Sequence, residues 1–274
     1  MIVQENVNRL NSVISYIEDH LDAPIEYKKL AKILCVNEYS LHRIFFFVSD
    51  MSLSEYIRKR RISSACNDLL NGSKVIEVAM KYQYESSTSF GRSFKKMMGF
   101  SPKNITHFSN QIKYFPILHF ETPQKSFQEL SYELIENVSL NLYSVHKKIK
   151  RKELPLIVSS FWDTFLVKEE FRNVDKRYGI VEYDRFTDTP EITTYHIAYL
   201  KPFPKSKPYH IENRTFLKFR IESRKAEDIS LFTKYIYSSF IPYSCFKIDT
   251  IPDIEEYVGN QTTNIYIPVT YKSF

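Results

Sequence analysis

The sequence predicts two domains, an N-terminal all-α domain followed by a C-terminal α+β domain. At 274 residues the chain is long enough for two domains of ordinary size, about 100 to 200 residues each. Apolar residues recur at helical spacing from Arg9 to Phe100, whereas β-branched and aromatic runs dominate beyond Ser101-Pro102. A hydrophobic share of 43% is sufficient for folded cores and excludes general disorder.

The N-terminal half is predicted to form short helices around one long helix. Ala23-Pro24 interrupts the first apolar stripe, Ser54 is suited to cap the long helix, and Asn71-Gly72 is suited to end it. The predicted helices cover about residues 10–21, 27–33, 38–48, 54–70, 75–82 and 87–98.

A helix–break–helix pattern occurs twice in this half. Ala31 recurs as Ala79, and after the break Arg43 recurs as Arg92, with one extra residue in the second turn. A small residue lets two helices cross closely, and the second helix can then present polar residues to a major groove. The basic run Arg58–Arg61 fits a polyanion-binding face, although a solvated helix face is an equally simple explanation. We therefore expect two helix-turn-helix units joined by the long helix.

The C-terminal half repeats the order strand, helix, strand, strand. Residues 107–131 show no sustained periodicity and are interpreted as a linker. The predicted elements of the duplicated β-α-β-β unit are 133–147, 153–168, 178–186 and 192–200, then 213–222, 225–240, 249–258 and 264–271. Such a unit predicts a mixed or antiparallel sheet with helices on one face and a concave surface.

Residues 9–106 resemble the DNA-binding domain of the AraC/XylS transcription regulators. The matching run is Val75-Ile76-Glu77-Val78-Ala79, Tyr84-Glu85-Ser86, Phe90, Arg92, Phe94-Lys95-Lys96, Gly99 and Ser101-Pro102. The resemblance implies a domain over residues 1–106 that binds double-stranded promoter DNA with two recognition helices, about 34 Å apart along the groove. It also implies an activator that contacts RNA polymerase.

The resemblance implies particular DNA-contacting residues. The groove-facing positions are Tyr39, His42 and Arg43 in the first unit and Ser87, Thr88, Gly91 and Arg92 in the second, with Lys95 facing the phosphate backbone. Both arginines are suited to grip guanine O6 and N7 with two hydrogen bonds.

The chain departs from the AraC/XylS pattern at several positions. Both turns lack the family's glycine and have Cys35 and Gln83 instead, so they bend with some strain or in another way. Ile105-Thr106 replaces an aromatic-Arg pair. Gly91 within a helix is explained equally well by close approach to DNA and by tolerated drift.

Residues 132–274 resemble, less sharply, the gyrase-inhibitor-like (GyrI-like) effector-binding domain. The resemblance rests on the repeated strand order, Trp162, Ile254-Glu255-Glu256-Tyr257 and Ile265-Tyr266-Ile267-Pro268-Val269. It implies that Trp162, Glu255 and Tyr257 bind a small amphipathic or cationic effector, since an acid among aromatic rings suits lipophilic cations. The simpler alternatives are a core tryptophan and a solvated acid. The domain could also dock another protein or, as a third hypothesis, hydrolyse its ligand.

Other functional classes find little support in the sequence. No H-E-x-x-H, G-x-S-x-G or phosphate-cradling glycine loop occurs, so neither an enzyme nor a cofactor is expected. The three cysteines are far apart, which disfavours a disulfide framework or a cysteine zinc site. No apolar run approaches the ~18 residues of a membrane helix, and no signal-peptide core is visible. We expect a cytoplasmic protein.

Overall fold

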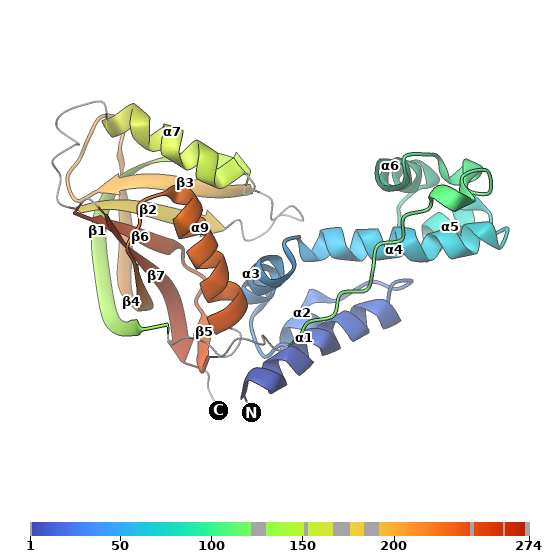
Figure 1. Cartoon of the computed structure of the whole chain (residues 1–274), viewed down its shortest axis with the longest axis horizontal. Helices are drawn as coiled ribbons and strands as arrows, with labels where there is room; N and C mark the ends of the chain where they lie inside the picture. Colours follow the sequence, from blue (N-terminus) through green and yellow to red (C-terminus); the bar gives the residue numbers. More distant parts are fainter. Residues whose placement is uncertain are drawn as a thin grey trace. The chain divides into compact units, whose positions relative to one another are not determined.

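The chain divides into a helical N-terminal unit and a sheet-rich C-terminal unit, as the sequence predicts (Figure 1). The computed structural model describes residues 2–121, 130–150, 153–166, 176–183, 192–241, 244–259 and 261–271. Apart from the first two residues, the first compact unit comprises 3–41 and 49–122, and the second comprises 42–48 and 123–274.

The N-terminal half forms α-helices close to the predicted ranges, except that the first begins earlier. The helices are α1 (Ile2–Asp19), α2 (Tyr27–Ile33), α3 (Glu38–Ser49), α4 (Leu53–Leu70), α5 (Val75–Lys81) and α6 (Ser87–Met98), followed by the short 3-10 turns η1 (Pro102–Asn104) and η2 (Ser109–Gln111). Helix α4 begins one residue before the predicted cap, because the side chain of Ser52 accepts the backbone N–H of Glu55. Most of α3 belongs to the second compact unit.

Both helix–break–helix turns use the left-handed conformation that usually calls for glycine. Cys35 has φ 56° and Gln83 has φ 64°. In each turn a backbone N–H reaches back five residues to a small residue, from Val36 to the Ala31 carbonyl and from Tyr84 to the Ala79 carbonyl, both at 2.9 Å. The turns therefore keep one geometry and accept the strain of a side chain at positive φ.

The segment after η2 lies along helices of the first unit rather than spanning free space. The side-chain amide of Asn11 pairs with the backbone of Phe120 through two 2.8 Å hydrogen bonds. Ser63 accepts the backbone N–H of Phe115 at 2.8 Å, and Arg60 donates to the carbonyl of Phe115. Part of the predicted linker, residues 107–121, is thus anchored to α1 and α4, while 122–129 lie outside the described residues.

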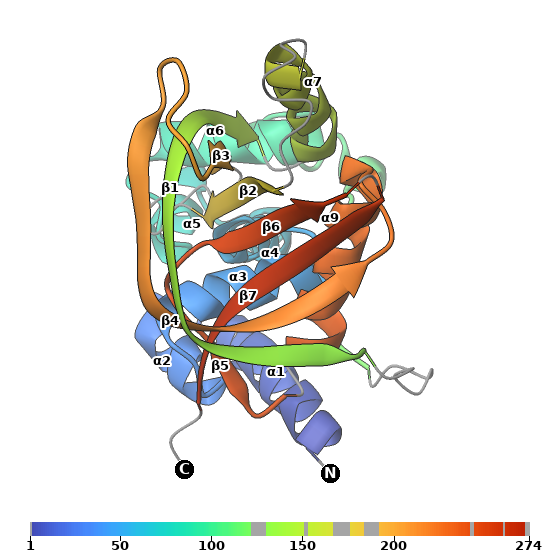
Figure 2. The ribbon, with the colours of Figure 1, turned by 90° about the vertical axis from the view of Figure 1, so that its left-hand side faces the viewer.

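The second unit is built on one sheet of antiparallel strands. Its elements are β1 (Tyr132–Lys150), α7 (Leu154–Leu166), β2 (Lys176–Tyr183), β3 (Ile192–Tyr199), β4 (Lys207–Ile221), α9 (Ala226–Tyr235) with the π-helical turn η4 (Ile236–Phe240), β5 (Phe246–Ile248), β6 (Asp253–Val258) and β7 (Thr262–Tyr271). The strand order is β4-β1-β3-β2-β6-β7-β5. Because β4 also pairs with β7, the sheet curves round and closes on itself (Figure 2). Register shifts near Val138 let β1 and β4 bend together.

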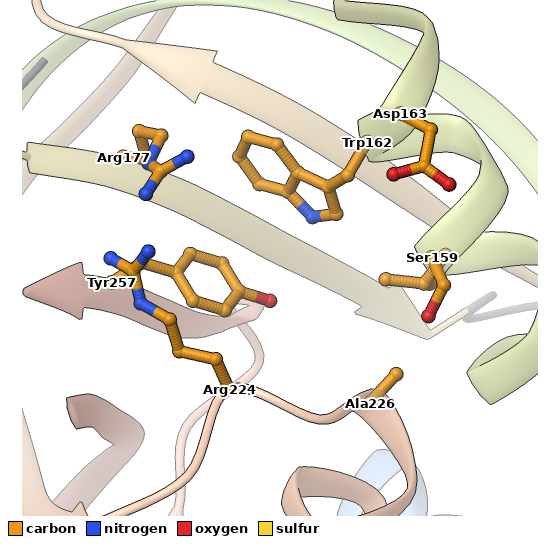
Figure 3. Close-up of a pocket in the computed structure, with 8 residues that line it drawn as sticks. Ser159, Trp162, Asp163, Arg177, Arg224, Ala226 and Tyr257 are labelled. Atoms are coloured by element: carbon orange, nitrogen blue, oxygen red, sulfur yellow. The ribbon is translucent and has the colours of Figure 1, made fainter. Parts of the chain in front are cut away.

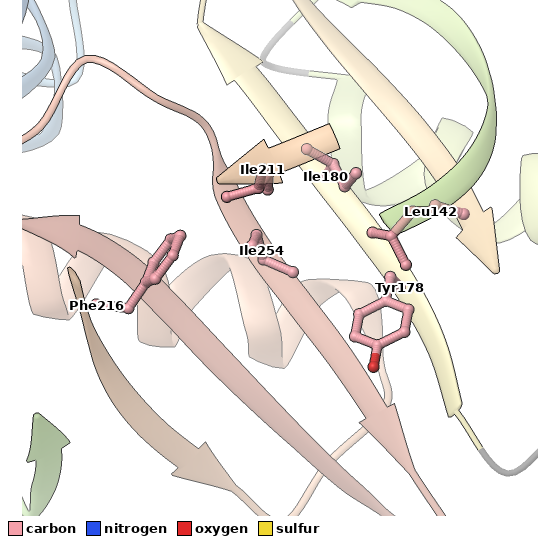
Figure 4. Packing of buried hydrophobic residues seen from close by; sticks show 7 residues of the cluster. Leu142, Tyr178, Ile180, Ile211, Phe216 and Ile254 are labelled. Carbon is pink, nitrogen blue, oxygen red and sulfur yellow. The ribbon is translucent and has the colours of Figure 1, made fainter. Parts of the chain in front are cut away.

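Alternation along the strands separates two faces of this sheet. Tyr178 and Ile180 of β2 pack with Leu142, Phe216 and Ile254 in the apolar core (Figure 4). Intervening residues of β2, including Arg177 and Gly179, face the opposite side. That side carries the cavity described below.

Candidate functional site

Helix α6 presents a basic face to solvent. Its apolar residues Phe90, Phe94 and Met98 are buried at spacing i, i+4 and i+8. Ser86 caps its start by accepting the backbone N–H of Ser89 at 3.1 Å, and Gly99 ends it at φ 87°. The cap and the apolar stripe fix which side of the helix remains exposed.

The exposed side of α6 holds most of the residues predicted to contact DNA in the second helix-turn-helix unit. Thr88, Arg92 and Lys95 are exposed and share one face at spacing i, i+4 and i+7. Ser87 and Gly91 are half-buried and lie between that face and the core. Helix α6 contains no acidic residue, so the charge of this face is uniformly positive. We call Thr88, Arg92 and Lys95 the α6 basic face.

The positions predicted to contact DNA in the first helix-turn-helix unit have a different environment. Tyr39 and His42 are half-buried, and Arg43 is only 2% exposed. Arg43 forms an ion pair with Asp253, and its guanidinium lies 4.0 Å from the ring centroid of Tyr183. The structure therefore does not gather these three side chains on an exposed face, and their contact with DNA stays a prediction.

Replacing Gly91 by alanine distinguishes the two explanations of this helical glycine. Among the described residues, a Cβ atom at Gly91 would point into open space beyond its own helix, so we expect Gly91→Ala to stabilise the protein by about 1 kcal/mol in thermal unfolding followed by circular dichroism. If the glycine serves close approach to DNA, the same variant binds duplex DNA more weakly despite its higher stability. Unchanged affinity would identify the glycine as tolerated drift.

The second unit contains a cavity of about 200 Å³ between α7, the sheet and the start of α9. Trp162 and Tyr257 supply aromatic walls, and their ring centroids lie 5.2 Å apart at an interplanar angle of 77° (Figure 3). The complete lining is Val158, Ser159, Trp162, Asp163, Arg177, Arg224, Ala226 and Tyr257.

A hydrogen-bonded cluster holds the aromatic wall from behind. The indole Nε1 of Trp162 donates to Tyr195 Oη at 3.0 Å. Tyr195 Oη donates to Glu255 Oε2 at 2.8 Å, and Tyr257 Oη donates to the same oxygen at 2.6 Å. These contacts connect α7 to strands β3 and β6, and they fix the orientation of the tryptophan and of Tyr257.

The electrostatic state of the cluster follows from its burial. Burial raises the pKa of Glu255, although hydrogen bonds from the two tyrosines oppose this effect. Burial also raises the pKa of Tyr195 and of Tyr257 well above the ordinary value, so both remain protonated donors at neutral pH. Glu256 lies on the opposite face of the sheet, and its pKa shifts in the opposite direction to that of Glu255. Burial opposes its ionisation, but hydrogen bonds from Asn264, Tyr266 and Lys176 prevail and lower its pKa.

The structure brings the three predicted ligand residues together but gives them different positions. Trp162 and Tyr257 line the cavity, whereas Glu255 is absent from the lining and sits beneath the tyrosine hydroxyls. Glu255 and Tyr257 share a face and Glu256 points away, as strand alternation predicts. Sequence reasoning missed Arg177, Arg224, Tyr195 and Gly179. None belongs to a recognisable motif, and their grouping depends on strand register and, for Arg224, on the connection between β4 and α9.

The buried carboxyl of Glu255 predicts a characteristic pH dependence. Its folded-state pKa lies above the ordinary 4.5, so the folded protein binds this proton more tightly than the unfolded chain. We expect the free energy of unfolding of the wild type, relative to Glu255→Gln, to fall as pH rises above 4.5 through the raised pKa and to be constant at lower pH. Denaturant titrations at a series of pH values, followed by the fluorescence of the single tryptophan, measure this difference.

Glu256→Gln is the matched control with the opposite sign. The folded-state pKa of the Glu256 carboxyl is lowered, so its stabilising contribution in the wild type is present above the ordinary 4.5 and is lost as pH falls through the lowered value. A wild-type advantage over Glu255→Gln that does not change with pH would contradict the buried, titrating carboxyl.

Two further classes of site are absent from the part of the chain that the structure describes. No group of three or more His, Cys, Asp or Glu side chains there is placed to bind a metal ion. None of the described helices combines the length and apolar character needed to cross a membrane.

Comparisons with known proteins match parts of this chain. A family model described as a helix-turn-helix domain matches residues 30–107. The HTH-type transcriptional activator AarP of Providencia stuartii is 34% identical over 94 residues, which cover 34% of this chain and 70% of AarP. The HTH-type transcriptional regulator YbfP of Bacillus subtilis strain 168 is 35% identical over 94 residues, which cover 34% of this chain but only 32% of YbfP.

One similar solved structure is that of SAV2435 bound to tetraphenylphosphonium. It has a TM-score of 0.42 and 14% sequence identity, and the match covers 51% of this chain and 94% of that one. A likeness of this size assigns no ligand to the present chain.

Proposed function

This chain belongs to the AraC family of helix-turn-helix transcriptional regulators, and on that premise we propose that it activates transcription by binding promoter DNA through the α6 basic face. The observation that carries this proposal is the solvent-exposed face of Thr88, Arg92 and Lys95, which lies opposite a buried apolar stripe and contains no acid. A helix of this kind fits the major groove with its polar face toward base edges. RNA polymerase is the partner expected of an activator in this family.

Each residue of the α6 basic face suits a particular part of the duplex. The planar guanidinium of Arg92 can donate two hydrogen bonds to guanine O6 and N7. The methyl group of Thr88 suits a thymine methyl, and the ammonium of Lys95 suits a phosphate. The half-buried Ser87 lies at the helix N-terminus, where backbone N–H groups also favour phosphate.

The second unit is proposed to sense a small molecule that modulates this activity. The supporting observation is the cavity of about 200 Å³ beside Trp162, since an open aromatic cavity favours a ligand over a docked protein segment. The hydrolytic alternative gains no support, because the Glu255 carboxyl accepts two tyrosine hydroxyls and does not line the cavity.

Salt-dependent binding of Lys95→Ala tests the DNA-binding proposal. We expect the full-length protein to bind a duplex isolated from a random library by in vitro selection. Lys95→Ala should weaken binding to specific and random duplexes alike and reduce the slope of log K against log salt by about one, because one phosphate contact is lost. Fluorescence anisotropy of labelled duplexes at several salt concentrations gives both quantities.

Lys201→Ala is the matched control, since Lys201 is an exposed lysine of the second unit. It should leave the salt slope unchanged. An equal effect of the two variants would refute the role of α6, and failure of the wild type to bind any duplex would refute the DNA-binding function.

A further inference from the structure

The cavity wall carries an excess of positive charge. Arg177 and Arg224 both line it, and the only acidic lining residue among those described is Asp163. Figure 3 shows the two guanidinium groups toward one side of the cavity and Asp163 toward the other, beyond Trp162. No ion pair joins Asp163 to either arginine in the described part of the chain. Among the described residues, the arginine side therefore has no neutralising carboxylate in the cavity lining.

Each arginine also has hydrogen-bonding capacity that the described residues do not use. The Nε atoms of Arg177 and Arg224 are buried, and neither has a hydrogen-bond partner among the residues that the structure describes. A buried donor without a partner destabilises a folded protein, so two of them beside one cavity point to an acceptor that enters it. Burial and the neighbouring Arg177 charge lower the pKa of Arg224, which indicates that the two cations repel one another.

Aromatic rings define the rest of the ligand. The guanidinium of Arg224 lies 5.8 Å from the ring centroid of Tyr257, so cation and ring form one continuous wall. Trp162, Val158 and Ala226 extend this wall with apolar surface. At about 200 Å³ the cavity is smaller than the ~300 to 1,000 Å³ of drug-sized sites, and it fits a compact ring better than a bulky compound.

We infer that the cavity binds a small aromatic anion, with the carboxylate or phosphate held by Arg177 and Arg224 and the ring held against Trp162 and Tyr257. This inference rests on the proposed sensing function and reverses the charge expected from the sequence, where Glu255 suggested a cationic ligand. The reversal follows from position, because the carboxyl of Glu255 is occupied beneath the tyrosines while the arginines reach the cavity.

Three compounds of nearly identical shape test the charge. Benzoate, benzamide and benzamidine carry −1, 0 and +1 on the same ring. Each is titrated into the full-length protein while the fluorescence of the single tryptophan, Trp162, is recorded. We expect saturable quenching that is at least about tenfold tighter for benzoate than for the other two, since a hydrogen bond to a charged group contributes about 1.5 to 3 kcal/mol. Phenyl phosphate in the same titration separates carboxylate from phosphate ligands.

Single substitutions connect binding to the two arginines. Arg177→Gln and Arg224→Gln should each weaken benzoate binding at least about tenfold, whereas Lys225→Gln, which removes an exposed neighbouring charge outside the lining, should leave it unchanged. Benzoate should also raise the Tm of the wild type and of Lys225→Gln more than that of either arginine variant. This second measurement shows at the same time that the variants are folded.

The results separate the inference from the proposed function. If benzamidine binds as tightly as benzoate, or if benzoate still binds both arginine variants, the inference of an anionic ligand is wrong. The proposed sensing function would stand in that case. If no compound of the series changes the fluorescence or the Tm of the folded protein, both the inference of an anionic ligand and the proposed sensing role of this cavity are wrong. The DNA-binding proposal is tested separately and stands in either case.

Discussion

Gly179→Ala is expected to destabilise the second unit by about 3 kcal/mol, at the upper end of what overpacking costs. Gly179 lies on β2 opposite Glu255 of β6. A Cβ atom there would lie 2.2 Å from Tyr195 Oη and 2.6 Å from Glu255 Oε2. Neither atom can retreat cheaply, because the hydroxyl and the carboxylate are hydrogen-bonded to one another and are buried. Denaturant unfolding followed by Trp162 fluorescence measures the loss, since this tryptophan reports on the second unit.

A double-mutant cycle identifies the cause of that loss. Tyr195→Phe removes the hydroxyl nearest to the added methyl group, so Gly179→Ala should cost less in the Tyr195→Phe background than in the wild type. Gly91→Ala makes the same chemical change where the described residues leave open space beyond the helix itself, and it should stabilise the protein. Additive costs in the cycle would mean that the strain arises elsewhere than at the tyrosine hydroxyl.

Arg92→Ala is expected to remove about 1 to 3 kcal/mol of discrimination at one base pair of the preferred DNA site. Arg92 is exposed on α6 and belongs to the same face as Thr88 and Lys95, so its guanidinium is available for base edges. The variant should bind the selected duplex more weakly while its affinity for random duplex changes less. Competition of single-base-substituted duplexes against the selected one would locate the affected base pair.

Arg92→Lys separates base reading from simple attraction to phosphate. Lysine keeps the charge but loses the two-pronged geometry, so the lysine variant should show the relaxed specificity of Arg92→Ala and retain the wild-type salt slope. Full specificity in Arg92→Lys, or equal loss on every duplex in Arg92→Ala, would mean that Arg92 contacts the backbone and does not read a base.

Much of the helical half could be predicted from local sequence. The apolar stripe of Phe90 and Phe94, the cap at Ser86 and the stop at Gly99 lie within fourteen residues of one another, and each acts through neighbours along the same helix. The face that carries Arg92 and Lys95 follows from them. The strained turns at Cys35 and Gln83 also show that positive φ was retained although glycine was not.

The segment after η2 illustrates what local patterns do not contain. Phe115 and Phe120 bind side chains of α4 and α1 through their backbone atoms, and such contacts leave no periodicity in the sequence. The residues therefore resembled a linker. Their partners Ser63 and Asn11 are about 50 and 109 positions away along the chain.

The sequence by itself determined the two-part organisation, the helices and the basic face of α6, because helix periodicity and capping depend on residues a few positions apart. Only the tertiary structure decided the character of the cavity. Antiparallel pairing of β2 with β6 sets Gly179 opposite Glu255 and Arg177 opposite Tyr257, and the chain beyond β4 adds Arg224. These residues are up to 80 positions apart, and strand register, which brings them together, is fixed by the packing of the whole sheet.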